Sequence, residues 1–192
     1  YAMMGASYAR NGLNLDVPRV GLLNVGTEEH KGRAELKAAQ DLIANAAGIG
    51  GYEFKGFVEG GDIPGDKVDV IVTDGFTGNV ALKTGEGTAK LVGDFLKEAF
   101  KATPLSRIAA LLALTSLKRL QTRIDPRRVN GGVFLGLKGT VVKSHGSADA
   151  TGVSAAIKLA YELSASGFSE RLAARVASAV ASAQNDGTSE PK

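Results

Sequence analysis

Three short polar stretches of this sequence combine glycine with side chains that can bind an oxyanion. A lysine ammonium neutralises negative charge, and hydroxyl, amide and imidazole groups supply hydrogen bonds. Glycine allows a close backbone approach that a Cβ would block, and N–H groups near a helix start attract anions. The candidate residues are Lys31 in the first stretch, Asp74, Gly75, Thr77, Gly78, Asn79 and Lys83 in the second, and Ser144, His145, Gly146, Ser147 and Asp149 in the third. Together they are typical of a site that handles phosphate.

Each candidate also has a purely structural explanation. In an arbitrary protein, Lys31 would more often be a solvated charge, Asn79 a helix cap, and His145 a brace for its own loop. Only the expected meeting of the three stretches in space favours a phosphate site over these explanations.

The segments that precede these stretches have the pattern of buried strands. Residues 20–26, 68–73 and 140–143 are short apolar runs of the kind found in parallel sheets, and residues 52–58 alternate like a further strand. Helical periodicity occupies residues 1–11, 36–46, 79–100, 104–123, 150–166 and 168–184. This alternation predicts an α/β domain with a mostly parallel sheet, whose ligands lie at the carboxyl ends of the strands.

Composition narrows the possible function classes. The 192 residues are 44% hydrophobic and contain no apolar run long enough for a membrane span, as expected for one globular domain. The net charge of +3 is too small to indicate nucleic acid binding. The absence of cysteine excludes a disulfide framework and a cysteine nucleophile. Scattered aspartates and missing nucleotide-binding and serine-hydrolase motifs argue against a metal centre, a dinucleotide cofactor and a Ser-His-Asp hydrolase.

Five segments closely resemble the phosphate acyltransferases of bacterial glycerolipid synthesis, the PlsX family. They are VGLLNVGTEEHKG at 20–32, GFVEGGDIP at 56–64, DVIVTDGFTGNVALKTGEG at 69–87, NGGVFLG at 130–136 and KSHGSADA at 143–150. The leading MGASYAR also fits, and the resemblance extends to about residue 166. Its most specific part is the D-G-F-x-G-N-x-x-L-K segment.

This resemblance implies a homodimeric enzyme with a Rossmann-like sheet flanked by helices, related to isocitrate and isopropylmalate dehydrogenases. It implies transfer of a fatty acyl group from acyl carrier protein to inorganic phosphate, with no cofactor. Family members are about twice as long, so residues 1–192 are expected to form a single catalytic α/β domain that lacks its amino-terminal half. The expected location is the cytoplasm, with peripheral association at the inner face of the membrane.

A mechanism consistent with the residues and the resemblance needs no covalent intermediate, because phosphate is already a usable nucleophile. The protein must position the dianion against a thioester and stabilise the tetrahedral oxyanion. Our hypothesis assigns the charge role to Lys31 and a hydrogen bond to phosphate or oxyanion to Asn79. Asp74 would orient one of these groups, and His145 would bind phosphate or assist the leaving thiol.

Residues 103–128 are basic and too rich in leucine for a fully solvated helix, and the resemblance favours a protruding helical arm there. Three roles compete: a dimer interface, docking of the acidic carrier protein, and contact with an anionic membrane surface. The expected contact residues are Arg107, Leu111, Leu114, Lys118, Arg119 and Arg123.

Three alternatives remain open at this point. A phosphate acetyl- or butyryltransferase that uses acyl-coenzyme A needs the same phosphate pocket. A metal- and NAD-dependent decarboxylating dehydrogenase of related fold needs paired aspartates, which the sequence does not display. A non-catalytic membrane scaffold would bind membrane but not phosphate. Residues 185–192 are expected to be a disordered tail.

Overall fold

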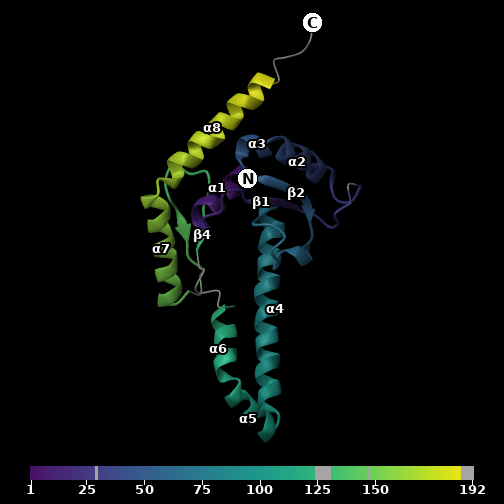
Figure 1. The fold of residues 1–192 in the computed structure, drawn as a ribbon, viewed down its shortest axis with the longest axis vertical. Helices are drawn as coiled ribbons and strands as arrows, with labels where there is room; N and C mark the ends of the chain where they lie inside the picture. The colour runs from purple at the N-terminus through teal and green to yellow at the C-terminus, as the bar shows by residue number, and fades with distance from the viewer. Residues whose placement is uncertain (29, 124–130, 147, 187–192) are drawn as a thin grey trace.

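The parallel sheet expected from the sequence lies in the body of the molecule, between its two elongated ends (Figure 1). The computed structural model describes residues 1–28, 30–123, 131–146 and 148–186. Strands β1 (Arg19–Leu23), β2 (Glu53–Val58) and β3 (Val70–Val72) pair in the order β2-β1-β3, and both pairings are parallel. The α/β class with helices flanking a parallel sheet is therefore confirmed.

The middle strand β1 fixes the register of its neighbours. Val20 lies opposite Phe54 of β2 and Val70 of β3, and Leu22 lies opposite Phe57 and Val72. The β1–β2 register shifts between Val20 and Leu22, and β2 carries a glycine with positive φ, Gly56, in the corresponding stretch. Such an irregularity is how a strand absorbs one extra residue.

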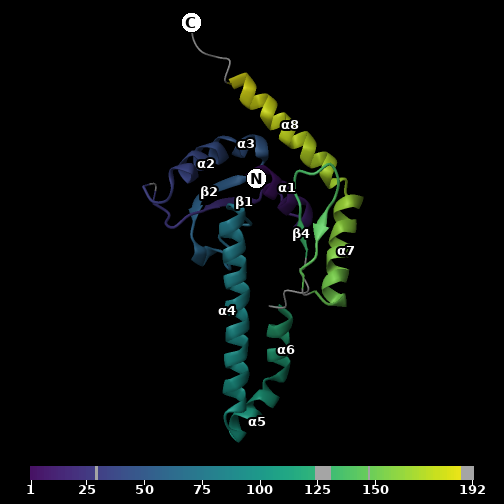
Figure 2. The ribbon, with the colours of Figure 1, turned by 180° about the vertical axis from the view of Figure 1, so that it is seen from behind.

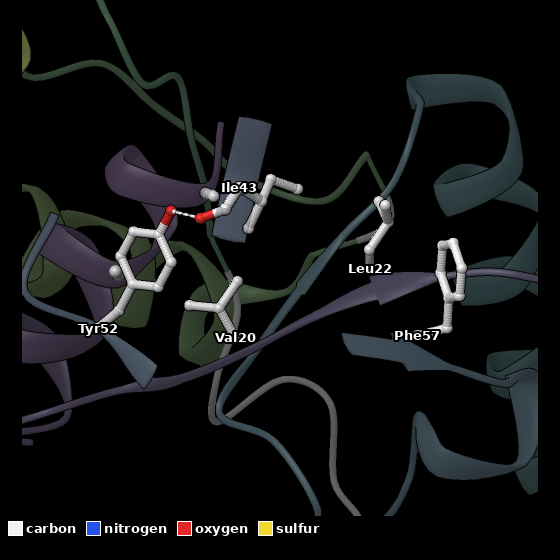
Figure 3. Close-up of a cluster of buried hydrophobic side chains, with 7 residues drawn as sticks. Val20, Leu22, Ile43, Tyr52 and Phe57 are labelled. Carbon is white, nitrogen blue, oxygen red and sulfur yellow. Dashed lines mark hydrogen bonds between the residues drawn. The ribbon is translucent and has the colours of Figure 1, made fainter. Parts of the chain in front are cut away.

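Helices α1 (Ala2–Gly12), α2 (Ala34–Asn45) and α3 (Ala47–Gly50) pack on the sheet and build its apolar core. Figure 3 shows Val20, Leu22, Ile43, Tyr52 and Phe57 in this core. The Tyr52 hydroxyl donates to the backbone oxygen of Ile43 at 2.7 Å, so the buried phenol has a partner. Small and branched side chains do most of the filling, as the low aromatic content predicts.

A second unit corrects part of the sequence-based topology. A strand does form at Val142–Lys143 (β5), but it pairs antiparallel with β4 (Gly132–Val133) instead of joining the parallel sheet. The residues between the two strands are too few for the crossover that a parallel pair requires, so they can only form an antiparallel pair. Helices α7 (Ala150–Ala165) and α8 (Phe168–Asp186) belong to this unit.

The second unit has its own small core around Leu163, Phe168 and Leu172. Tyr8 of α1 meets Phe168 edge-on, with ring centroids 6.1 Å apart, so α1 contacts both cores. Helix α8 extends to Asp186, and residues 185 and 186 of the expected disordered tail are therefore helical. The rest of that tail, 187–192, lies outside the described residues.

The expected arm protrudes from the body as a helical hairpin (Figures 1 and 2). Helix α4 (Gly75–Lys101) runs outward, α5 (Pro104–Leu112) turns at the tip, and α6 (Leu114–Arg123) returns. Thr103 caps α5 through the Ser106 amide. None of the described residues of these three helices is buried. The arm thus begins within α4, earlier than predicted, and residues 124–128 lie outside the described range.

Gly21 in the middle of β1 has no room for a side chain. A Cβ there would lie 2.6 Å from Cγ1 of Val58 and 3.2 Å from Cγ1 of Val68. We expect Gly21→Ala to lower the free energy of unfolding of the complete protein by about 1–3 kcal/mol, because overpacking forces β2 outward. Urea unfolding measures this change. Gly48→Ala in α3 is the matched control, since nothing lies within 4 Å of its Cβ position; an equal loss there would refute the steric explanation.

Candidate functional site

Lys31 lies at the carboxyl edge of the parallel sheet, in the segment between β1 and α2. Its Nζ pairs with Oε1 of Glu28 at 2.6 Å, and this hydrogen bond raises the pKa of Lys31. Nearly half of the Lys31 side chain is exposed, so the ion pair contributes little to stability. The ammonium is therefore charged, close to the sheet edge and accessible to a dissolved anion.

Asn24 holds the backbone of the segment between β1 and α2 by a hydrogen bond. It follows β1 directly, is 6% exposed, and donates from Nδ2 to the backbone oxygen of Lys31 at 3.2 Å. The amide of Asn24 donates to the oxygen of Val58 at 2.9 Å, which continues the pairing of β1 with β2. The loop is thus joined to the rigid part of the sheet.

The second stretch is the first part of a helix, which corrects the expected loop at 74–79. Asp74 is the N-cap of α4: Oδ1 accepts from the Thr77 amide at 2.8 Å and Oδ2 accepts from the Thr77 hydroxyl at 2.6 Å. Gly75, Thr77, Gly78 and Asn79 consequently lie in the first turns of α4. Both Asp and Asn are good caps, and here the cap position belongs to Asp74 and not Asn79.

The starts of α2 and α4 lie close together at this edge. Arg33 is the N-cap residue of α2, and its charge contributes to the lowered pKa of Asp74, after the larger effect of the Thr77 hydrogen bonds. Two helix N-termini, Arg33 and Lys31 therefore bring positive potential to the segments that follow β1 and β3. The carboxylates of Glu28 and Asp74 lie at the same edge and offset part of this charge.

The third stretch reaches α4 through one contact that is distant in sequence. His145 Nε2 lies 3.1 Å from Nζ of Lys83, and Nζ of Lys83 lies 2.7 Å from Oε2 of Glu86. Glu86 Oε1 is 3.9 Å from the same imidazole nitrogen. The hydrogen bond from Lys83 lowers the pKa of Glu86. Lys83, Glu86 and His145 form a half-exposed cluster between the two units.

The structure places some of the candidate residues in contact, and the functional roles of all of them stay predictions. It brings Lys83 and His145 together, and Ser144 and Gly146 lie beside His145 in the chain. Asp149 caps α7 by accepting from the Gly152 amide at 3.0 Å. Ser147 lies outside the described residues. The grip of Lys31, Asn79 and His145 on one anion stays a prediction.

Three residues of this region were not selected from the sequence: Asn24, Arg33 and Glu86. Asn24 has a usable signal, a polar residue that ends an apolar strand run directly before a glycine-bearing loop. In the sequence, Arg33 and Glu86 look like ordinary charged residues on a helix surface. Only the structure shows that they lie near candidate residues, Arg33 near Asp74 and Glu86 beside Lys83. In the part of the chain that the structure describes, no three His, Asp or Glu side chains gather as metal ligands would.

Comparisons with known proteins agree on one family. A family model described as fatty acid synthesis protein matches residues 1–171. A phosphate acyltransferase of Cereibacter sphaeroides is 79% identical over 179 residues, which is 93% of this chain and 48% of the relative. Phosphate acyltransferases of Ruegeria pomeroyi and Jannaschia sp. are 74% and 72% identical, over 97% and 99% of this chain and 50% and 53% of their own length. The chain spans about half the length of the curated relatives it matches.

The cap of α4 makes a pH-dependent prediction. The Thr77 hydrogen bonds hold the pKa of Asp74 below its usual range, so the ionised carboxylate stabilises the folded state. That contribution is complete above the unfolded pKa of about 3.9 and is lost as the pH falls through the lower folded pKa. Thr77→Val should raise the Asp74 pKa, because it removes the hydroxyl donor. A ¹³C carboxyl titration measures the pKa, with Thr84→Val as the control; an unchanged Asp74 pKa in Thr77→Val would contradict the assignment.

Proposed function

This chain belongs to the fatty acid synthesis protein family, and on that basis we propose that the complete protein transfers a fatty acyl group from acyl carrier protein to inorganic phosphate. The product is acyl phosphate, a precursor for phospholipid synthesis. The observation that carries this proposal is the identity of 72–79% to proteins named phosphate acyltransferase, across nearly the whole chain. The position of Lys31 and of two helix starts beside the edge of a parallel sheet supports the same chemistry.

Phosphate binding is assigned to the charged edge of the sheet. Lys31 neutralises part of the dianion, and the Gly75 amide at the start of α4 donates a hydrogen bond to its oxygens. Asn79 lies in this part of α4 and is exposed, so its amide is available to phosphate or to the tetrahedral oxyanion. Asp74 contributes indirectly, because its cap fixes the first turn of α4.

The acyl transfer balances without a covalent enzyme intermediate. A phosphate oxygen attacks the thioester carbonyl, the C–S bond breaks, and the carrier thiolate takes up a proton. A lysine ammonium only donates hydrogen bonds, so Lys83 is the donor in its contact with Nε2 of His145. We assign to this pair the protonation of the leaving thiolate, with Glu86 holding Lys83 in place.

The arm is proposed to serve assembly rather than chemistry. Its apolar side chains are strongly exposed, and Leu112 at the tip is 86% accessible to solvent. We propose that the long apolar face of α4 packs against a second copy in a homodimer, and that α5 and the basic side of α6 contact carrier protein or an anionic membrane. Of the helices in the described part of the chain, none is long and apolar enough to cross a bilayer.

The assay that tests the proposed reaction measures acyl phosphate formed by the complete protein from long-chain acyl carrier protein and phosphate. Lys31→Ala and Asn79→Ala should each lower the rate by about 10²–10³, because each removes one fixed donor to a developing charge. Lys97→Ala, which removes an exposed charge further along α4, is the control. Activity with acyl-coenzyme A and none with acyl carrier protein would favour the acetyl- or butyryltransferase alternative.

Flotation with anionic liposomes tests the membrane role of the arm. Leu111→Asp with Leu114→Asp should abolish flotation of the complete protein, because a carboxylate on the apolar face opposes burial at the acyl boundary and is repelled by anionic lipid. Leu13→Asp changes an exposed leucine on the body and should leave flotation unaltered. If the double variant floats as well as the unchanged protein, the tip does not insert, and the dimer and carrier-protein roles remain.

A further inference from the structure

Asn24 is a polar side chain in an apolar place. It lies at the end of the central strand β1, is 6% exposed, and has core residues on the strand before it. Burying an amide costs free energy unless its groups find partners. Only the nitrogen of this amide has a hydrogen-bond partner. Nδ2 donates to the backbone oxygen of Lys31 at 3.2 Å, whereas Oδ1 has no hydrogen bond within the described residues.

The surroundings of Oδ1 show that the loop containing Lys31 and Gly32 packs directly against the Asn24 side chain. Oδ1 faces the backbone of Gly32, where a Cβ would collide with it and would lie 2.8 Å from Cγ of Asn24. Gly32 also has a φ of +87°, a conformation that other residues rarely adopt. The turn that follows Lys31 is therefore shaped to rest directly on this amide.

The side chain of Lys31 is held by Gly26 and Glu28. Its aliphatic part crosses Gly26, where a Cβ would collide with Cδ of Lys31 and would lie 2.7 Å from Oε2 of Glu28. Glu28 then holds the ammonium at 2.6 Å. Asn24 therefore holds the backbone of Lys31, glycine leaves space for its aliphatic part, and Glu28 pairs with its ammonium, so both ends of the residue are restrained.

We propose that Asn24 is a positioning residue that acts through Lys31: it fixes the loop so that the ammonium points at the phosphate that attacks the thioester. This inference rests on the proposed function and adds a residue to its site. Asn24 itself touches no substrate. Its amide contributes by keeping the Lys31 carbonyl in place, so its removal matters only as long as the lysine is present.

The test is a double-mutant cycle in the complete protein, measured as acyl phosphate formation. Asn24→Ala should lower kcat/KM for phosphate by about 10²-fold, the usual effect of a small misplacement of a reacting group, and leave KM for the acyl donor unchanged. In a Lys31→Ala background the same change should cost less than about twofold, because residues that act as one unit are not additive.

Two further variants separate positioning from folding. Asn24→Asp keeps the shape but turns a carboxylate oxygen toward the Lys31 carbonyl, and it should show the same dependence on Lys31. Ser7→Ala alters a side chain on α1 that is 1% exposed and also lacks a partner for its hydroxyl in the described structure, and it should keep full activity. Thermal unfolding of each variant establishes that the protein measured is folded.

The outcomes are distinct. Full turnover in a folded Asn24 variant, or an equal loss with and without Lys31, overturns the positioning role. If the unchanged protein forms no acyl phosphate, the proposed function fails instead, and hydrogen exchange decides the inference alone. Asn24→Ala should then speed exchange of the Lys31 amide, which donates to the Glu28 oxygen at 3.0 Å, without affecting β3. Unchanged exchange at Lys31 would overturn the inference.

Discussion

The packing of α1 between two apolar cores is the constraint on which this part of the molecule depends. One side of the helix meets the parallel sheet so closely that a Cβ on Gly5 would lie 2.6 Å from Cγ1 of Val70. Its other side places Tyr8 against Phe168 of the second unit. Because one short helix is buried on two sides, it sets the distance between two units that share no sheet.

The contact between the candidate residues of the two units follows from that spacing. The polar segments after β1 and β3 meet because their strands are neighbours in one sheet. The segment after β5 has no such reason to be near them, since β5 pairs only with β4 in the described structure. Its His145 reaches Lys83 because α1 holds the small antiparallel pair beside the sheet. A histidine and a lysine 62 positions apart thereby come within 3.1 Å of each other.

Much of the fold was predictable from periodicity alone. The strands at β1, β2 and β3 and all the described long helices lie within a few residues of their expected positions, because apolar spacing reports which face is buried. The start of α4 differs from the predicted one, since Asp74 and Asn79 cap helices equally well. The pairing of β5 was also missed, because strand pattern alone does not give a partner.

The site was predictable only in part, for a related reason. Residue type and adjacent glycine selected Lys31, Asp74 and His145 from the sequence. Glu86 became visible only through its place beside Lys83, and Asn24 through its burial. The local sequence pattern predicts which secondary structure a segment forms. The functional role of a charged or amide side chain depends on the neighbours that the fold places around it.

The length of α4 has a further consequence. Its 27 residues form one continuous helix that begins at Gly75 and ends at Lys101, a span of about 40 Å at 1.5 Å per residue. Whatever contacts the tip is therefore remote from the start of α4, by more than a bilayer core is thick. Along α4, a force on the tip can reach that first turn only as a tilt or a twist of the whole helix.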